Sequence, residues 1–266
     1  EWIFVDLAIA CAAGATTTIY PNTAREEFDY ILTDSGSVVL FAEDKGQLDK
    51  ALGRDVLDAQ LHTIVLIDPD GVELNDRVIS YRQLLDAGEA HLAEQPTAVD
   101  DAIASTSRET LSTLIYTSGT TGTPKGVRLN HISWVYEGIA TKHLDVIEHT
   151  DLQYLWLPLS HVFGKALIAC QLEYGFTSAV DGRIDRIVDG LGEVRPTFMC
   201  GAPRIFEKVR GAVMTGSKGV KARIARWAFA VGRDAVPYLS KGQELPRRLA
   251  IQHRLADRLV YSKLKE

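Results

Sequence analysis

In residues 111–127, a loop rich in glycine and hydroxyl side chains directly follows a short apolar segment that is typical of a strand. Within residues 117–126 the chain carries five Ser or Thr hydroxyls, three glycines and one lysine. Glycines allow backbone N–H groups to turn inward and approach an anion closely. A lysine near the end of the loop adds a mobile positive charge. The pattern therefore predicts a phosphate-binding loop that leaves the end of a strand.

This loop differs from the two commonest nucleotide-binding loops. A P-loop needs Gly-Lys followed by Ser or Thr, whereas here Pro124 precedes Lys125 and Gly126 follows it. A GxGxxG fingerprint that opens a helix is not present in this stretch either. The alternative is a flexible Ser/Thr/Gly surface linker. The ordered Gly, Pro and Lys placement directly after a strong strand is atypical of linkers and favours the phosphate loop.

Apolar runs alternate with helical patterns along most of the chain, which predicts an α/β fold with mostly parallel sheets flanked by helices. We expect strands at 15–19, 37–42, 62–67, 111–116, 153–157, 176–180 and 197–200. We expect helices at 2–13, 24–34, 81–94, 131–147, 162–173, 184–194 and 203–214. Capping boxes are expected at Thr23 with Glu26 and at Ser80 with Gln83.

The polar, aperiodic stretch at 95–108 predicts a linker between two lobes, at about 1–100 and 108–215. Two long basic helices are expected in the segment 217–266. From Pro203 onward the chain has 15 basic and 5 acidic residues, although the whole chain of 266 residues has a net charge of −6. The chain lacks the net positive charge that is typical of nucleic-acid-binding proteins, so no nucleic-acid partner is expected.

The three cysteines, Cys11, Cys170 and Cys200, lie in apolar stretches without CxxC spacing, which fits a reducing cytosol and no metal site. The first residues lack the basic start of a signal peptide, and no apolar run is long enough to span a bilayer. We therefore expect a cytoplasmic protein. The chain starts without Met inside a helical pattern, and we expect its N-terminus to be truncated.

The string from Tyr116 to Val127 (YTSGTTGTPKGV) resembles the signature loop of the adenylate-forming, AMP-binding enzymes, which include acyl-CoA synthetases and luciferases. Further segments resemble family motifs in the right order: residues 12–21, LPLSHVFG at 157–164 and RPTFMCGAPRIFEKV at 195–209. The last segment and the helical stretch after it are most similar to bacterial long-chain fatty acyl-CoA synthetases. The resemblance covers essentially the whole chain as a partial N-terminal domain.

This resemblance implies a long-chain fatty acid–CoA ligase (AMP-forming) that uses ATP, Mg²⁺ and CoA. The fatty acid would attack the α-phosphate of ATP, and the CoA thiol would then displace AMP. By resemblance, the residues around the β- and γ-phosphates would be Thr117, Ser118, Gly119, Thr120, Thr121, Gly122 and Lys125. Charge that develops on the leaving pyrophosphate would be stabilised there.

The resemblance places His161 beside the α-phosphate and the acyl carboxylate, where a histidine can donate a hydrogen bond to developing charge. A helix-capping or packing histidine is the alternative. The acyl channel would be walled by Val162, Phe163, Gly164, Gly201 and Ala202, with ordinary core packing as the alternative for each.

The family's adenine-binding segment with its magnesium-binding Glu, its ribose-binding Asp and its C-terminal domain with the catalytic Lys would all follow residue 266. The metal ligands are therefore expected outside this chain, and the chain alone is expected to be inactive. Two rivals to the ligase stay open. One is a fatty acyl-AMP ligase that loads a carrier protein, and the other is a truncated chain that binds nucleotide or acyl ligands without turnover.

The segment 218–236 reads as a basic amphipathic helix. An apolar face would contain Val220, Ile224, Trp227, Ala228 and Val231. Such a helix can lie on an anionic membrane, here the inner membrane face. Packing against the rest of the domain is the alternative.

Overall fold

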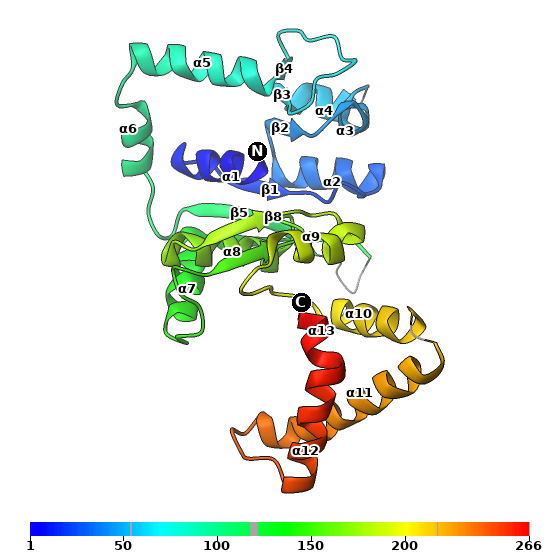
Figure 1. The fold of residues 1–266 in the computed structure, drawn as a ribbon. Helices are drawn as coiled ribbons and strands as arrows, with labels where there is room; N and C mark the ends of the chain where they lie inside the picture. Colours follow the sequence, from blue (N-terminus) through cyan, green and yellow to red (C-terminus); the bar gives the residue numbers. More distant parts are fainter. Residues whose placement is uncertain (54, 118–121, 217, 266) are drawn as a thin grey trace. The chain divides into compact units, whose positions relative to one another are not determined.

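The computed structural model describes residues 1–266 apart from 54, 118–121, 217 and 266 (Figure 1). Its contacts divide the chain into two compact units. The N-terminal unit comprises Glu1–Ile184 and Pro196–Phe198, and the C-terminal unit comprises Asp185–Arg195 and Met199–Glu266. The expected α/β class is confirmed, because short parallel and mixed sheets alternate with helices in the N-terminal unit.

The first sheet carries the predicted phosphate loop. Its order is β1 (Thr16–Thr18), β5 (Leu111–Thr117) and β6 (Lys125–Asn130). β1 and β5 run parallel, whereas β5 and β6 form an antiparallel hairpin. The strand β6 was not expected from the sequence. The loop that leaves β5 is therefore a hairpin loop.

A second sheet of three parallel strands forms the main apolar core of the N-terminal unit. It consists of β2 (Val39–Ala42), β3 (Thr63–Leu66) and β4 (Val78–Ser80). The central strand contains the apolar run Ile64, Val65 and Leu66, each 0% exposed, as expected for a strand covered on both faces. The flanking helices are α2 (Arg25–Ser35), α3 (Lys45–Ala51), α4 (Asp55–Gln60) and α5 (Tyr81–Glu94).

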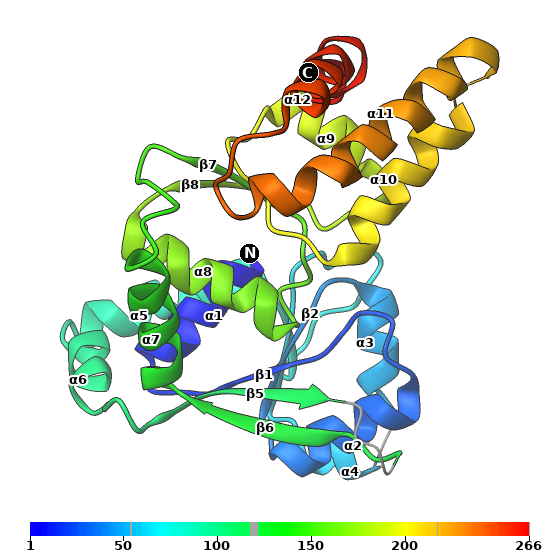
Figure 2. The same ribbon diagram turned by 90° about the horizontal axis from the view of Figure 1, so that it is seen from below.

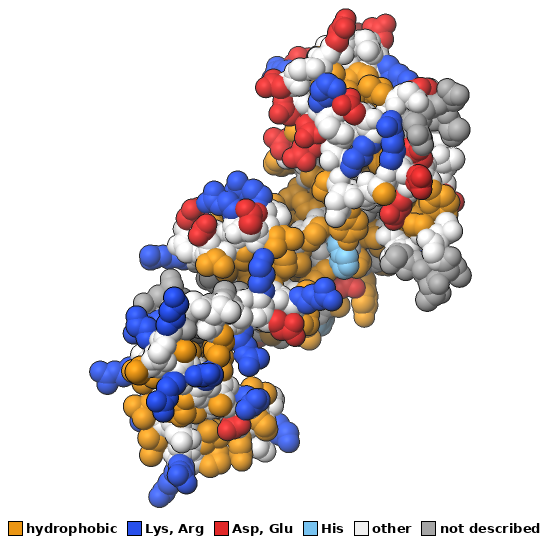
Figure 3. Space-filling view, turned by 90° about the vertical axis from the view of Figure 1, so that its right-hand side faces the viewer, with side chains coloured by type: hydrophobic (Ala, Val, Ile, Leu, Met, Phe, Trp, Pro, Cys, Tyr) orange, Lys and Arg blue, Asp and Glu red, His pale blue; other side chains and the backbone are white. Residues whose placement is uncertain are grey.

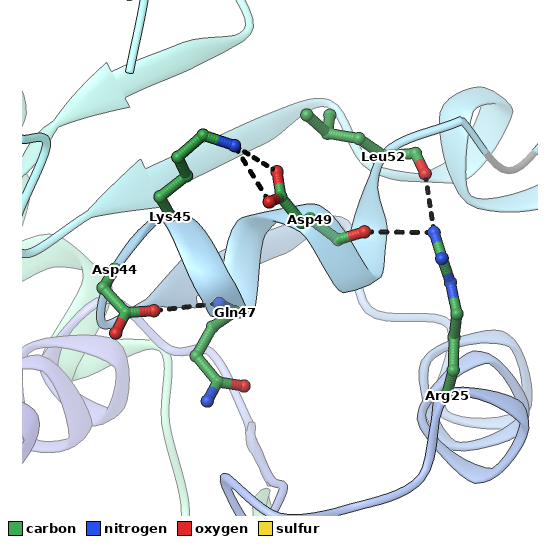
Figure 4. Close-up of polar contacts among 6 residues, drawn as sticks. All are labelled: Arg25, Asp44, Lys45, Gln47, Asp49 and Leu52. Carbon is green, nitrogen blue, oxygen red and sulfur yellow. Dashed lines mark hydrogen bonds and ion pairs between the residues drawn. The ribbon is translucent and has the colours of Figure 1, made fainter. Parts of the chain in front are cut away.

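Side-chain hydrogen bonds fix the ends of α3, as Figure 4 shows. Asp44 Oδ1 accepts from the backbone N–H of Gln47 at 2.9 Å and so caps the first turn. At the other end, the guanidinium of Arg25 on α2 donates to the carbonyls of Asp49 and Leu52, at 3.0 and 3.1 Å. These last carbonyls of a helix lack intrahelical partners, so Arg25 joins α2 to the C-terminus of α3.

One of the two expected capping boxes is confirmed and the other is wrong. Ser80 and Gln83 form a reciprocal capping box at the start of α5. The helix α2 begins one residue later than expected, with Ala24 as its N-cap and no side-chain cap bond. The backbone just before α2 is bound from α3 instead, where Lys50 Nζ donates to the carbonyl of Pro21 at 2.6 Å.

Three helices lie together beside β5 in the N-terminal unit (Figure 2). They are α1 (Trp2–Cys11), α7 (His131–Lys142) and α8 (Val162–Tyr174). A parallel pair, β7 (Leu152–Leu155) and β8 (Thr177–Val180), flanks α8 in sequence. The strand expected at 197–200 is reduced to a single bridge between Phe198 and Gln153.

The stretch 95–108, which the sequence predicts to be a linker, contains the helix α6 (Ala98–Ala104). β1 precedes this stretch and β5 follows it, yet the two strands pair in one sheet. The placement of the two lobes stays a prediction.

The C-terminal unit is helical, as expected. Its core is a small cluster of Ala228, Val231 and Ala256, against which Trp227 and Leu249 pack. In the part of the chain that the structure describes, no helix combines the length and apolarity needed to cross a membrane. The helical elements of the C-terminal unit are α9 (Ile187–Val194), α10 (Pro203–Gly216), α11 (Gly219–Leu239), α12 (Arg247–Ala256), η2 (Asp257–Tyr261) and α13 (Ser262–Lys265).

Candidate active site

The two ends of the predicted phosphate loop are direct partners across the β5–β6 hairpin. In the antiparallel register Thr117 lies opposite Lys125, and Tyr116 lies opposite Gly126. Gly122 has φ of +87°, a conformation that a residue with a Cβ rarely adopts. Ser118, Gly119, Thr120 and Thr121 lie outside the described residues. The register places the exposed Lys125 side chain at the start of the strand that receives the loop.

Tyr116 anchors the start of this loop. Its hydroxyl donates to Asp34 Oδ2 at 2.6 Å, and its ring meets that of Tyr30 edge to face with centroids 6.3 Å apart. Both partners lie on α2, so α2 holds the end of the strand β5 in place before the loop. Burial and the hydrogen bond to Asp34 raise the pKa of the Tyr116 phenol well above its usual range, so it remains a donor at every physiological pH.

His161 is the N-cap of α8, which is the capping role weighed as the alternative. Its Nδ1 accepts from the backbone N–H of Phe163 at 3.1 Å. Because Nδ1 is the acceptor, the neutral imidazole carries its proton on Nε2. Capping and chemistry are therefore compatible, since an exposed Nε2–H stays free to donate to a ligand.

The turn that carries His161 is tied to the sheet of the phosphate loop. Thr18 on β1, 5% exposed, donates to the carbonyl of Ser160 at 2.9 Å. Thr18 is also the β1 partner of Ile115 on β5, two residues before Thr117. The base of the loop and the residue before His161 are thus joined through one threonine.

The remaining predicted site residues fall into two groups. Val162 and Phe163 are exposed on the first turn of α8, at 44% and 39%. Gly164 is buried, and a Cβ there would lie 2.3 Å from the carbonyl oxygen of Pro158, so close packing of this turn requires glycine. Gly201 and Ala202 belong to the C-terminal unit, where Gly201 contacts Ile205 of α10.

Sequence reasoning missed two buried charges next to this site. Lys165 Nζ on α8 lies 2.5 Å from Asp6 Oδ1 on α1, and both side chains are 7% exposed. The pair forms part of the wall of a cavity of about 290 Å³ between α1, β5, α7 and α8. Burial lowers the pKa of Lys165, and the ion pair with Asp6 counteracts part of that shift. A lone charge inside each apolar run, WIFVDLAIAC and VFGKALIAC, was the available signal.

The fold is that of an α/β chain with a glycine-rich hairpin loop after β5. The AMP-binding enzyme family matches residues 1–251, and the chain belongs to that family.

Similar proteins come from animals and bacteria. The long-chain-fatty-acid–CoA ligase ACSBG2 of Gallus gallus is 31% identical over 100% of this chain. The long-chain-fatty-acid–CoA ligase FadD15 of Mycobacterium bovis is 29% identical over 100% of this chain. The chain spans 36% and 43% of the lengths of these two relatives.

Solved structures share the fold. A crystal structure of a long-chain-fatty-acid-CoA ligase (FadD1) from Archaeoglobus fulgidus aligns with a TM-score of 0.59 at 18% identity. The alignment covers 81% of this chain and 40% of that chain. At this identity the likeness supports the fold alone.

Proposed function

We propose that this chain is the phosphate-binding portion of a long-chain fatty acid–CoA ligase that forms AMP. The observation that carries the proposal is the match to the AMP-binding family over residues 1–251, together with full-length alignment of the chain to long-chain-fatty-acid–CoA ligases. The hairpin loop between Thr117 and Lys125 supports it, because a charged leaving group needs positioned donors.

The proposed reaction has two steps. In the first, a carboxylate oxygen of the fatty acid bonds to the α-phosphorus of ATP while the bond to the bridging oxygen breaks, which releases pyrophosphate and leaves acyl-AMP. In the second, the deprotonated thiol of CoA attacks the acyl carbonyl carbon and AMP departs. The parent activity is therefore that of an ATP-dependent acid–thiol ligase.

Each described site residue has a role in this proposal. The backbone around Gly122 and the ammonium of Lys125 would hold the β- and γ-phosphates with Thr117 and the segment 118–121. His161 Nε2 would donate to the oxygens where the carboxylate and α-phosphate meet. Val162, Phe163 and Gly164 would line part of the acyl channel.

Mg²⁺ accompanies ATP in this proposal, but the described residues contain no group of three His, Cys, Asp or Glu side chains that could hold a metal ion. We assign none of the steps above to the ion.

The test is fatty-acid-dependent exchange of labelled pyrophosphate into ATP by a full-length protein that contains these residues. We expect exchange with palmitate and none with acetate. Absence of exchange with any fatty acid, despite ATP binding, would support a non-catalytic nucleotide-binding chain. A product assay with CoA and with a phosphopantetheinylated carrier protein then separates the CoA ligase from the acyl-AMP ligase.

Contact with an anionic membrane is a second proposal, carried by the basic surface of α11. Four exposed basic side chains lie at its N-cap and on its first half: Lys218, Lys221, Arg223 and Arg226. Figure 3 shows Lys and Arg side chains spread over the C-terminal unit. Part of the apolar face of α11 is used in packing, because Ala228 and Val231 are buried against α12, whereas Val220 is exposed. Membrane contact through the basic residues would be electrostatic and would weaken with salt. Co-sedimentation with anionic liposomes at low and high salt tests it.

A further inference from the structure

The pair of Lys165 and Asp6 is unusual in its burial. Among the described residues, these are the only buried charged residues, each 6% exposed overall. The ion pair, with an Nζ–Oδ1 distance of 2.5 Å, joins α1 to α8, and its two residues lie 159 positions apart in the sequence. Charges are seldom buried unless they are paired. The pair therefore fixes how α1 and α8 are placed against each other, which apolar packing alone would define less strictly.

Lys165 also connects α8 to two further elements. Its Nζ lies 5.2 Å from the centroid of the Trp134 ring on α7. Trp134 Nε1 in turn donates to Thr113 Oγ1 on β5 at 3.2 Å. A single ammonium group is thus bound from two helices, one of which is hydrogen-bonded to the strand of the phosphate loop. Such directional contacts define the rotation of α8 about its axis.

Lys165 reaches His161 through one helical turn. The backbone N–H of Lys165 donates to the carbonyl of His161 at 3.1 Å, which closes the first turn of α8. His161 does not line the cavity beside the ion pair, so Lys165 acts on it through the helix backbone. A helix with its side chains has a radius of roughly 5–6 Å. A rotation of about 20° would therefore move the imidazole by about 2 Å, and a misplacement of about 1 Å can reduce a rate about 10²-fold.

We propose that Lys165, through its buried pair with Asp6, is a positioning residue that fixes the rotation of α8 and so the direction in which His161 Nε2 points. The inference deepens the proposed ligase function and rests on it for its kinetic readout.

The kinetic test uses the full-length protein and Lys165→Met, which keeps an unbranched side chain of nearly the same length and removes the charge. We expect kcat for pyrophosphate exchange to fall about 10- to 100-fold, with KM for ATP within about twofold. In a His161→Ala background, Lys165→Met should cause less than a further twofold loss, because its effect acts through His161. Lys142→Met is the matched control, since it removes the exposed Lys142–Glu173 pair between α7 and α8 and should change kcat less than twofold.

A second comparison separates positioning from simple stability. Lys165→Met alone leaves Asp6 buried and unpaired, which destabilises. The double variant Asp6→Leu/Lys165→Met leaves no buried charge, so we expect its thermal-unfolding midpoint to recover while kcat stays low. Lys165→Arg keeps the charge and should recover part of kcat. Recovery of kcat to the wild-type value in the apolar double variant would overturn the proposal.

A readout that does not need activity is hydrogen exchange of peptides covering 158–166 in the full-length protein. We expect faster exchange there in Lys165→Met and no change in Lys142→Met. If the wild-type protein shows no fatty-acid-dependent exchange of pyrophosphate, the proposed function fails and hydrogen exchange alone decides this inference. Unchanged protection at 158–166, or kinetic effects of Lys165→Met and His161→Ala that multiply, would overturn it.

Discussion

The ring of Tyr116 lies across Gly126 on the neighbouring strand. A Cβ on Gly126 would fall 3.0 Å from Cζ of Tyr116 and 3.1 Å from its hydroxyl oxygen. The tyrosine stands at the start of the phosphate loop and the glycine just after its end. The glycine that follows the loop lysine therefore has a local steric reason. It leaves room for the ring that α2 holds in place through Asp34.

Gly126→Ala should displace the Tyr116 ring and so move the base of the loop. A Gly-to-Ala change at an unhindered strand position stabilises by about 0.5–1 kcal/mol, whereas overpacking costs about 1–3 kcal/mol. We expect a lower thermal-unfolding midpoint and a raised KM for ATP. Gly88→Ala on α5 is the control, because no atom lies within 4 Å of its added Cβ. A Gly126→Ala protein as stable as Gly88→Ala would contradict the steric account.

Lys125→Ala should lower the rate of pyrophosphate exchange in the full-length protein. Removing one positioned donor costs on the order of 10²–10³ in rate, and we expect the lower part of this range because backbone N–H groups remain. The control is Arg128→Ala, which removes a charge from the same strand at a position paired with Leu114. Equal rates for Lys125→Ala and wild type, at saturating fatty acid, would reduce the loop to a surface linker.

Gly164→Ala should be more damaging than its place in a helix suggests. Alanine would normally stabilise a helix interior by up to about 1 kcal/mol over glycine. Here the new Cβ would meet the backbone carbonyl of Pro158 at 2.3 Å, so the turn before α8 has to move. We expect a net loss of about 2 kcal/mol together with lower exchange activity. Thermal unfolding compared with Gly88→Ala checks this, and a midpoint at or above wild type would show that the turn can adapt.

Much of this architecture could be predicted from local patterns. The Ser80 capping box and the buried strand at 63–66 are encoded within a few residues, and both were found. β6 was missed because Gly126 and Arg128 carry no strand signal of their own, and pairing with β5 creates the strand. Asp6 and Lys165 were missed as partners because 159 residues separate them. The capping role of His161 was weighed, whereas the contact of Thr18 with Ser160 depends on tertiary structure.

Asp151 should contribute a pH-dependent share of stability. It accepts hydrogen bonds from the backbone N–H of Glu148 and from the hydroxyl of Thr197, each at 2.7 Å, and these lower its pKa. A carboxyl with a lowered folded-state pKa stabilises above its unfolded pKa of about 3.9, and this contribution is lost as pH falls through the folded value. Asp151→Asn should therefore lower the unfolding midpoint equally at pH 7 and pH 5. The difference from wild type should shrink below about pH 4, and a constant difference would argue against this origin.

In the sequence, all strands of the β2–β3–β4 sheet lie between β1 and β5, which pair in the other sheet. This order affects how a growing chain can assemble. The strands β2, β3 and β4 span residues 39–80, whereas β1 at 16–18 pairs with β5 at 111–117. On a ribosome, the inner sheet has all its strands available while β1 still waits for a partner not yet synthesised. The long segment between β1 and β5 also closes at a lower entropic cost once the inner sheet has compacted it. The pairing of β1 with β5, which joins the phosphate loop to the turn of His161, is therefore completed late, although β1 is synthesised early.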